Sequence, residues 1–384
     1  MYDFDEIIDR RHTNCAKWDT VGEEMLPMWV ADMDFKSPPE VIAALEARAR
    51  HGVFGYGGVY DGWYQALIYW MKKRYSWDVD QEWVSTSPGI VPALDMLVRA
   101  LTQPGDGVII QTPVYGPFFN VIHGNGRRLV ENPLYFDGCK YHMDLKSLEQ
   151  QIDSRTKLMI LCSPHNPMGR VWSHEELSTL GQLCLQHGII VVADEIHSDL
   201  VFPGCPHTVF AAISPELEQN CVVCNAPSKT FNIAGIQASS IIIPNQEIRS
   251  AYRQILHTSG LGLPNIFAAA ALEAAYTKGE AWLDELLVYV HANYEFTKDF
   301  IAHRIPQIKV IESEGTYLMW LDFRGLGLND EQLDEFIKEK ACLALSPGHI
   351  FGSGGSGFQR MNIACPRLLL EQGLQRLETA INDM

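Results

Sequence analysis

The sequence has no long hydrophobic run and no excess of positive charge. Its longest apolar stretches, such as Phe267–Ala275, are too short to span a membrane, and Glu273 interrupts that one. The N-terminal residues MYDFDEIIDRR are acidic and contain no apolar signal region. The net charge of −17 disfavours nucleic acid and anionic membranes as partners, because both bind basic surfaces. We therefore expect a cytoplasmic protein that binds neither nucleic acid nor a membrane.

The cysteines do not form the pattern of a disulfide framework. Their number is odd, at nine, and they are scattered along the chain, which fits a reducing compartment. Cys221 and Cys224 form a C-x-x-C motif, but there is no second pair to complete a metal site. On an extended strand their side chains would point to opposite faces. We expect buried structural cysteines and no metal; a redox or metal pair is the alternative.

Apolar, β-rich runs alternate with helical or turn-rich segments between Trp83 and Pro244. Most of these runs are continuously apolar, which is typical of strands that are buried on both faces. The pattern predicts an α/β fold with a large, mostly parallel, seven-stranded sheet covered by helices. The expected strands are Trp83–Ser87, Gly107–Gln111, Arg128–Asn132, Lys157–Cys162, Gly188–Ala193, Cys221–Cys224 and Ala238–Ile243.

The length of 384 residues predicts two domains. The chain from Pro264 to about Ile305 has a helical pattern with no proline between its ends, and we interpret it as a connector. We place a large α/β domain at 51–285 and a smaller α+β domain at 286–384, with residues 1–50 packing against the smaller one. The strands expected in the smaller domain are Lys309–Glu312, Tyr317–Phe323, Cys342–Ser346 and Gln359–Ala364.

Polar and aromatic residues follow five of the expected strands of the large domain. In an open α/β sheet, ligands bind at the carboxyl ends of the strands, so these segments are expected to line one crevice. The segments read TSPGIVPALDML, TPVYGPFF, CSPHNPMGRVW, ADEIHSDL and NAPSKTFN.

The first and fourth of these segments have features that suit a charged ligand. Gly89, Ile90 and Val91 lead into an expected helix, whose free N–H groups favour an anion such as phosphate, although such a turn is also common without a ligand. Asp194 ends a strongly apolar strand, where a carboxylate is costly unless it is paired. It either caps a helix or holds a proton on a ligand nitrogen. His197, three residues later, is either a hydrogen-bonded loop histidine or part of the site.

The other three segments supply an aromatic ring, an amide and a lysine. An arginine comes from the later expected strand Gln359–Ala364. Asn166 lies in a turn-forming NPMG string, and Tyr115 is either a packing residue or a surface on which a ring can stack. Arg360 lies within an apolar strand and needs an anionic partner, either an internal carboxylate or a substrate carboxylate. Lys229 follows the strand Cys221–Cys224 and is either an ordinary solvated lysine or a desolvated amine that could form a Schiff base with an aldehyde. Pyridoxal 5′-phosphate (PLP) would use all of these groups.

Taken together, these motifs resemble the fold-type I PLP enzymes, the aspartate aminotransferase superfamily. The segments MWVADMDF, GVFGYGG, DEIHSDL and PSKTFNIAG are similar to the MalY/PatB-type cystathionine β-lyases, or C–S lyases. The resemblance extends over the whole chain. Two positions differ from the usual aminotransferase pattern, because His197 replaces a tyrosine and Gln237 replaces a phosphate-binding arginine, and the lyase branch resembles this sequence at both.

The resemblance implies a role for each matching residue. Lys229 would bind PLP and act as acid and base at the substrate Cα, and Asp194 would pair with the ring nitrogen. Asn166 would bind the ring oxygen, Tyr115 would stack on the ring, and His197 would lie beside the cofactor. The phosphate would be bound by Gly89, Ile90, Val91 and Ser228. Tyr56 would reach in from the other subunit of a homodimer, and the substrate would be bound by Arg360, Asp32, Tyr56 and Tyr115.

The implied reaction is β-elimination from a small sulfur amino acid such as L-cystathionine, giving homocysteine, pyruvate and ammonia. An aminotransferase is the nearest alternative, because it uses the same groups for the first proton transfer. A binding protein that keeps the fold without catalysis is a third hypothesis. The joint presence of Lys229, Asp194, Asn166 and Arg360 argues against the third, since a binding module would need only some of them.

Overall fold

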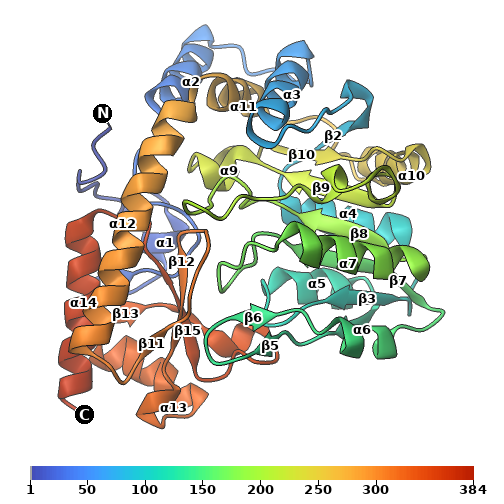
Figure 1. Ribbon diagram of the computed structural model, residues 1–384. Coiled ribbons are helices and arrows are strands. Elements are labelled where there is room, and N and C mark those ends of the chain that lie inside the picture. Colours follow the sequence, from blue (N-terminus) through green and yellow to red (C-terminus); the bar gives the residue numbers. More distant parts are fainter. Residues whose placement is uncertain (1) are drawn as a thin grey trace.

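The computed structural model describes residues 2–384, which form a large α/β domain and a smaller α+β domain (Figure 1). The central sheet contains all seven strands that the sequence predicts for the large domain. Six of them run parallel, and only β10 is antiparallel to its neighbours β2 and β9. The order across the sheet is β2 (Val84–Ser87), β10 (Ser239–Ile242), β9 (Cys221–Asn225), β8 (Ile190–Asp194), β7 (Thr156–Cys162), β3 (Gly107–Ile110) and β4 (Arg128–Glu131).

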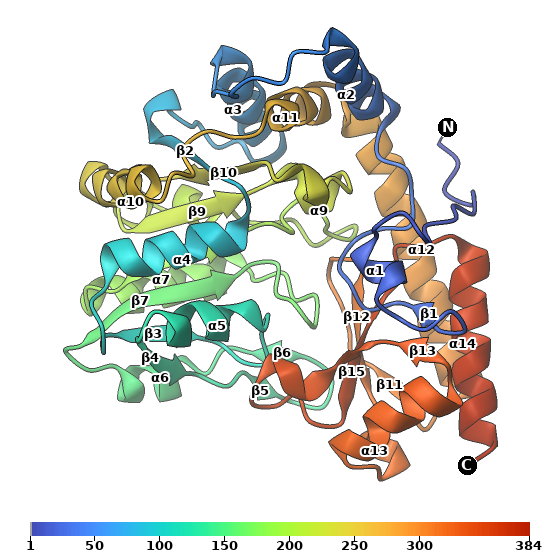
Figure 2. The same ribbon diagram turned by 180° about the vertical axis from the view of Figure 1, so that it is seen from behind.

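Helices cover both faces of this sheet, which explains why its strands read as continuous apolar runs. Helices α4 (Ile90–Leu101), α5 (Pro117–Gly124) and α10 (Gln246–Thr258) lie on one face, in front of the sheet in Figure 2. Helices α7 (His174–Gln186) and α3 (Asp61–Tyr75) contribute to the core on the other face. Short helices α6 (Leu145–Gln151) and α8 (Pro215–Glu218) and the hairpin β5 (Tyr135–Phe136) and β6 (Tyr141–His142) complete this domain.

The C-x-x-C motif lies on β9, and its two cysteines point to opposite faces of the sheet. Cys221 packs in the core cluster that includes α7, whereas Cys224 packs in the cluster under α4 and α10. Both thiols are fully buried and unpaired. The expectation that both cysteines are buried and point to opposite faces of the sheet is therefore confirmed.

The connector consists of two helices, α11 (Ile266–Lys278) and α12 (Glu280–Arg304), which meet at Gly279. A Cβ atom at Gly279 would lie 2.6 Å from Cε1 of Phe231 and 2.6 Å from the carbonyl oxygen of Ala275, so the close packing at this junction requires glycine. Beside α11 lie α3 and α2 (Pro39–His51), and α12 runs from this end of the molecule to the smaller domain (Figures 1 and 2).

The smaller domain is built on an antiparallel sheet in the order β11 (Lys309–Val310), β12 (Leu318–Asp322), β15 (Phe358–Asn362) and β14 (Ser346–Pro347). Helices α13 (Asp330–Glu335) and α14 (Arg367–Asn382) belong to the same part of the chain, and α14 lies beside α12. The N-terminal region, with α1 (Ala16–Asp19), joins this domain because β1 (Leu26–Pro27) pairs in parallel with β13 (Leu343–Ala344).

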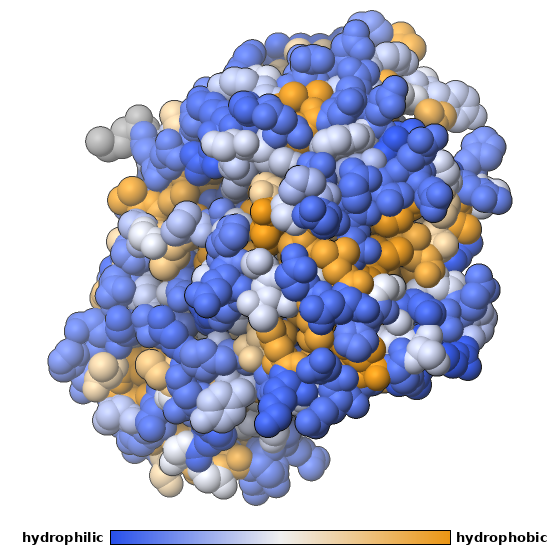
Figure 3. All heavy atoms as spheres, turned by 45° about the vertical axis from the view of Figure 1, so that its right-hand side comes forward, coloured by the Kyte–Doolittle hydropathy of each residue, from blue (hydrophilic) through white to orange (hydrophobic). Residues whose placement is uncertain are grey.

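The surface in Figure 3 is largely hydrophilic, with groups of hydrophobic residues across the middle of that face. Among the helices of residues 2–384, none combines the length and the apolar character that a membrane span needs.

Candidate active site

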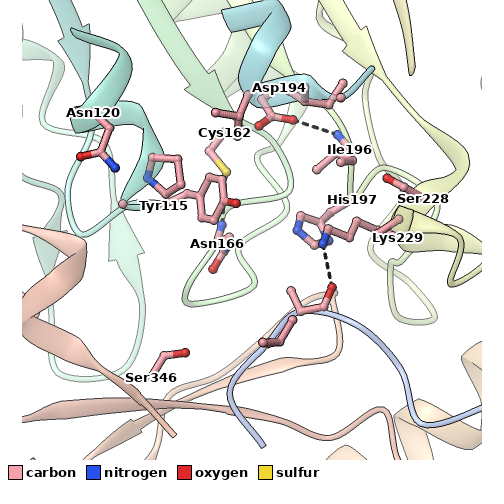
Figure 4. A pocket seen from close by; sticks show the side chains of 18 of the residues that line it. Tyr115, Asn120, Cys162, Asn166, Asp194, Ile196, His197, Ser228, Lys229 and Ser346 are labelled. Atoms are coloured by element: carbon pink, nitrogen blue, oxygen red, sulfur yellow. Dashed lines mark hydrogen bonds between the residues drawn. The ribbon is translucent and has the colours of Figure 1, made fainter. Parts of the chain in front are cut away.

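A cavity of about 800 Å³ lies between the carboxyl ends of the sheet strands and the smaller domain (Figure 4). It collects residues from all five predicted segments, as expected for a mostly parallel sheet. The predicted site residues that line it are Gly89, Ile90, Val91, Tyr115, Asn166, Asp194, His197, Ser228, Lys229 and Arg360.

Lys229 lies on the short helix α9 (Pro227–Thr230), which begins two residues after β9 ends. Its Nζ donates a hydrogen bond of 2.7 Å to the carbonyl oxygen of Ala31, shown as a dashed line in Figure 4. The surrounding protein atoms, and then the positive charge of Arg360, lower the pKa of Lys229 from 10.5 to about 8. A substantial fraction of the amine is therefore neutral near pH 8, and only the neutral form is a nucleophile.

Asp194 is the last residue of β8 and is buried, with 4% of its surface exposed. Its Oδ1 accepts a hydrogen bond of 3.2 Å from the backbone N–H of Ile196, and no helix begins at this point. In the described part of the chain, no cation lies within ion-pair distance of this carboxylate. Burial consequently raises the pKa of Asp194 from 3.8 to about 7. A positively charged ligand nitrogen would supply the missing partner.

Arg360 is the middle residue of β15, and its side chain reaches the opposite wall of the cavity. Its Nη1 donates to Oδ1 of Asn166 at 2.8 Å, and its Nη2 donates to the carbonyl oxygen of Trp29 at 2.8 Å and to Oγ of Ser346 at 3.1 Å. Its Nε is buried without a partner among residues 2–384. Burial lowers the pKa of Arg360 to about 10.

The partners of Arg360 are all neutral, so the internal ion pair considered for this residue is not found within residues 2–384. A guanidinium that is buried without a carboxylate and keeps one N–H unpaired is suited to bind a substrate carboxylate.

Tyr115, Asn166 and His197 surround the middle of the cavity (Figure 4). The Tyr115 ring is held edge-on against Phe118, with ring centroids 5.8 Å apart. The backbone N–H of Asn166 donates to Sγ of Cys162 at 3.4 Å. His197 is buried, which lowers its pKa to about 3, so its imidazole is neutral; its Nδ1 has no partner in the described chain. These three side chains present an aromatic face, an amide and a neutral imidazole to a ligand.

The anion site expected at the first strand end is present as the start of α4, a helix of 12 residues whose N-cap is Gly89. The first-turn N–H groups of Ile90 and Val91 have no helical carbonyl to bind, and Ser228 and Gln237 line the same cavity. Such free N–H groups, with the helix dipole, favour a phosphate. The residues present therefore fit PLP: an amine, an unpaired buried carboxylate, an anion site and flanking rings share one cavity.

Two predicted residues lie outside this cavity. Tyr56 has 97% of its side chain exposed and lines a second hollow of about 490 Å³, which shares Pro88 and Gln237 with the first. The Asp32 carboxylate faces the N-terminal region, where it pairs with Arg10 at 2.8 Å and lies 3.6 Å from Lys17.

Several lining residues were not predicted from the sequence, among them Cys162, Asn120, Ser346, Ile350 and Phe351. Cys162 ends an expected strand of the large sheet, so the strand-end rule would have found it. Ser346 lies in the antiparallel sheet of the smaller domain, to which that rule does not apply. Phe351 comes from the segment Phe351–Phe358, which the sequence suggested as either a mobile loop or a hairpin connection. Its ring lies under the guanidinium of Arg360, 5.0 Å away, and its carbonyl oxygen accepts from the N–H of Val114 at 2.8 Å.

The comparisons with known proteins agree with this geometry. Residues 23–377 match the family model "Aminotransferase class I and II". Cystathionine beta-lyase PatB of Bacillus subtilis is 45% identical, over 99% of this chain and all of the relative. Two solved structures are similar over the whole of this chain. Cystalysin from Treponema denticola, which contains PLP, is 40% identical with a TM-score of 0.97, and the match covers 99% of that chain. A PLP-bound putative aminotransferase from Clostridium difficile is 41% identical with a TM-score of 0.98, and the match covers 100% of that chain. This chain therefore belongs to the class I and II aminotransferase family, and within it to the PLP-dependent MalY/PatB-type cystathionine β-lyases.

Proposed function

We propose that the protein is a PLP-dependent carbon–sulfur lyase that converts L-cystathionine or a related sulfur amino acid into a thiol, pyruvate and ammonia. One observation carries the proposal: a lysine of lowered pKa, an unpaired buried aspartate and an unpaired buried arginine line the same cavity. Each of these groups matches a different part of a PLP–amino acid complex, and no two of them neutralise each other in an ion pair.

In the proposed binding mode, Lys229 holds PLP covalently and Asp194 binds its ring nitrogen. Tyr115 and His197 flank the ring, and Asn166 binds the ring oxygen. The phosphate lies at the N–H groups of Gly89, Ile90 and Val91 and at the Ser228 hydroxyl. When bound, PLP supplies an aldehyde for the substrate amino group and an electron sink for the bond to the Cα hydrogen.

The protein residues then orient the substrate and move its protons. Arg360 fixes the α-carboxylate, which limits rotation of the substrate and holds its Cα–H bond toward Lys229. Once the substrate amino group has replaced Lys229 on the cofactor, the freed and neutral Lys229 amine takes the Cα proton, and the carbonyl oxygen of Ala31 accepts a hydrogen bond from the resulting ammonium group. Asp194 keeps the ligand ring nitrogen protonated. Cleavage of the Cβ–S bond releases the thiolate, which is homocysteine when the substrate is cystathionine. Water then hydrolyses the remaining three-carbon enamine fragment to pyruvate and ammonia.

We also propose a homodimer in which Tyr56 of one subunit reaches the cavity of the other. The support is the exposure of apolar side chains around Tyr56, with Val53, Phe54 and Leu263 each more than 60% exposed. Such a patch favours burial against a partner. A single charge there, as in Phe54→Glu, should convert the dimer to monomers. Light scattering at micromolar concentration would measure this change, and a parent protein that is itself monomeric would disprove the arrangement.

The proposed organisation keeps the boundaries expected from the sequence, 1–50, 51–285 and 286–384, and the proposed location is the cytoplasm. The nine unpaired cysteines support a reducing compartment. Asp32 remains proposed as a substrate-side residue, acting from its ion pair with Arg10.

The lyase proposal is tested by pyruvate release from L-cystathionine with purified, PLP-loaded protein and no added keto acid. We expect sustained release by the parent and a loss on the order of 10³-fold in Lys229→Ala, because the general base is removed. Lys278→Ala, a substitution of an exposed lysine outside the cavity, is the matched control and should keep full activity. No release by the PLP-bound parent, combined with amino transfer to an added keto acid, would replace the lyase proposal with the aminotransferase alternative.

A further inference from the structure

One segment of irregular chain, residues 29–35, binds both cationic residues of the proposed reaction. The carbonyl oxygen of Ala31 accepts from Lys229, and the carbonyl oxygen of Trp29 accepts from Arg360, at 2.7 and 2.8 Å. The hydroxyl of Tyr317 also donates to the carbonyl oxygen of Ala31, at 3.1 Å. The position of the 29–35 segment therefore fixes where the amine and the guanidinium lie relative to each other.

Asn232 connects this segment to the loop that carries Lys229. Its Oδ1 accepts from the N–H of Met33 at 3.0 Å, and its Nδ2 donates to the carbonyl oxygens of Met33 and Phe35 at 2.9 and 2.8 Å. These three bonds use the acceptor and both donors of the amide group. Asn232 is only three residues from Lys229, so it is a direct link between the lysine loop and the segment that covers it.

The backbone at Asn232 supports the same conclusion. Its φ angle is +56°, in the left-handed region that asparagine tolerates better than most residues and glycine tolerates best. The loop closes on itself there, because the N–H of Ile233 donates to the carbonyl oxygen of Ser228 at 3.1 Å. The left-handed turn directs the amide of Asn232 at the 29–35 segment while the lysine points into the cavity.

The other anchors of the 29–35 segment come from outside the lysine loop. Asn362 of β15 donates to the carbonyl oxygens of Val30 and Asp32, and Lys17 pairs with Asp34 at 2.7 Å. These contacts fix the segment to the smaller domain and the N-terminal region. Asn232 instead fixes it to the loop that carries the reactive amine.

We propose that Asn232 is a positioning residue, which holds the carbonyl oxygen of Ala31 in place as the acceptor for the Lys229 amine whenever that amine is not bonded to the cofactor. The inference rests on the proposed lyase function. A shift of about 1 Å in a catalytic group can cost on the order of 10²-fold in rate. Loss of the three bonds should therefore lower kcat by between about 10- and 100-fold.

The decisive variant is Asn232→Gly, because glycine keeps the left-handed backbone and removes all three side-chain bonds. Asn14→Gly is the matched control, since Asn14 is exposed and also left-handed, with a φ of +60°. Pyruvate release from L-cystathionine gives kcat per bound PLP. A second readout uses PLP-free protein: the pH midpoint for acetylation of Lys229 by acetic anhydride, measured by peptide mass spectrometry.

We expect Asn232→Gly to lose at least tenfold in kcat and to lower the acetylation midpoint, because the ammonium form loses its fixed acceptor. Asn14→Gly should match the parent in both. Unchanged kcat in Asn232→Gly would show that only the backbone conformation matters and would overturn the proposal. A lower kcat with an unchanged midpoint would also overturn it, since the amine would then be correctly placed.

A second variant keeps the test valid if Asn232→Gly does not fold. Asn232→Asp retains the size and the Oδ1 acceptor but places an anionic oxygen against the carbonyl oxygens of Met33 and Phe35, so it should also lower kcat. Its negative charge would by itself raise the pKa of a nearby lysine, so the acetylation midpoint is compared only for the glycine variants. If the parent itself releases no pyruvate, the lyase proposal fails, whereas the acetylation midpoints of the variants still decide the role of Asn232.

Discussion

Asp194 is expected to destabilise the PLP-free protein at neutral and alkaline pH, and the substitution Asp194→Asn should remove this effect. The asparagine has the same shape and can still accept the hydrogen bond from the N–H of Ile196. It cannot ionise, so it avoids the cost of a buried carboxylate that has no cationic partner.

The magnitude follows from the raised pKa of Asp194. With a folded-state pKa of about 7 and an ordinary value of 3.8, the folded protein binds the proton more tightly than the unfolded chain between these two pH values. Stability therefore falls as the pH rises through this interval, by about 1.4 kcal/mol for each pH unit. Between pH 5 and pH 7 the loss is about 3 kcal/mol, and above pH 7 it is complete.

The assay is urea unfolding of PLP-free parent and Asp194→Asn at pH 5 and pH 8. The difference between the two proteins cancels the titration of groups that do not interact with Asp194, His197 among them. We expect the variant to gain about 3 kcal/mol relative to the parent between the two pH values, while PLP binding and lyase activity both fall. The exposed control Asp383→Asn should show no such change. A stability difference independent of pH would refute the assignment of Asp194 as an uncompensated buried carboxylate.

Two further predictions concern the cationic residues. Arg360→Lys keeps the charge but loses the planar fork, so the KM for L-cystathionine should rise about 10- to 100-fold with a smaller change in kcat, and an unchanged KM would exclude Arg360 as the carboxylate site. For Lys229, burial and Arg360 lower the pKa to about 8, so about a tenth of the amine is neutral at pH 7 and about nine tenths at pH 9. PLP capture by the PLP-free protein, followed by absorbance, should therefore accelerate about tenfold in total between pH 7 and pH 9 and then level off. A rate that kept rising tenfold for each pH unit would indicate an ordinary lysine.

The strands and the position of the site were predictable because they depend on local pattern and on one geometric rule. Most strands of the large sheet are apolar runs that are buried on both faces, so their composition identifies them; the edge strand β4 is only partly buried. Asp194, Lys229 and Asn166 each follow such a strand, and parallel strands bring their carboxyl ends to one edge. The antiparallel direction of β10 leaves no mark on composition, because this strand is buried in the same way.

The contacts made by irregular chain could not be predicted in the same way. Residues 29–35 have no periodic pattern, and their place over the cavity depends on hydrogen bonds from residues about 200 and 330 positions away, such as Asn232 and Asn362. The direction of the Asp32 side chain depends on Arg10 and Lys17, whose own positions come from tertiary packing. The expected role of Tyr56 requires a second copy of the chain. In each case the deciding partner is distant in sequence or lies outside the chain.

Some buried charged residues of this protein form ion pairs with each other, whereas, within residues 2–384, those that line the proposed active site do not. Lys17 and Asp34 are 1% and 3% exposed and lie 2.7 Å apart, so each compensates the other. Asp194, Lys229 and Arg360 have no such compensation, and burial shifts the pKa of each toward its neutral form. A folded chain gains no stability from this arrangement. In the proposed complex, bound ligands supply the missing opposite charges: a protonated ring nitrogen pairs with Asp194, and a substrate carboxylate pairs with Arg360. The residues that weaken the PLP-free protein are thus the ones expected to hold the cofactor and the substrate most tightly.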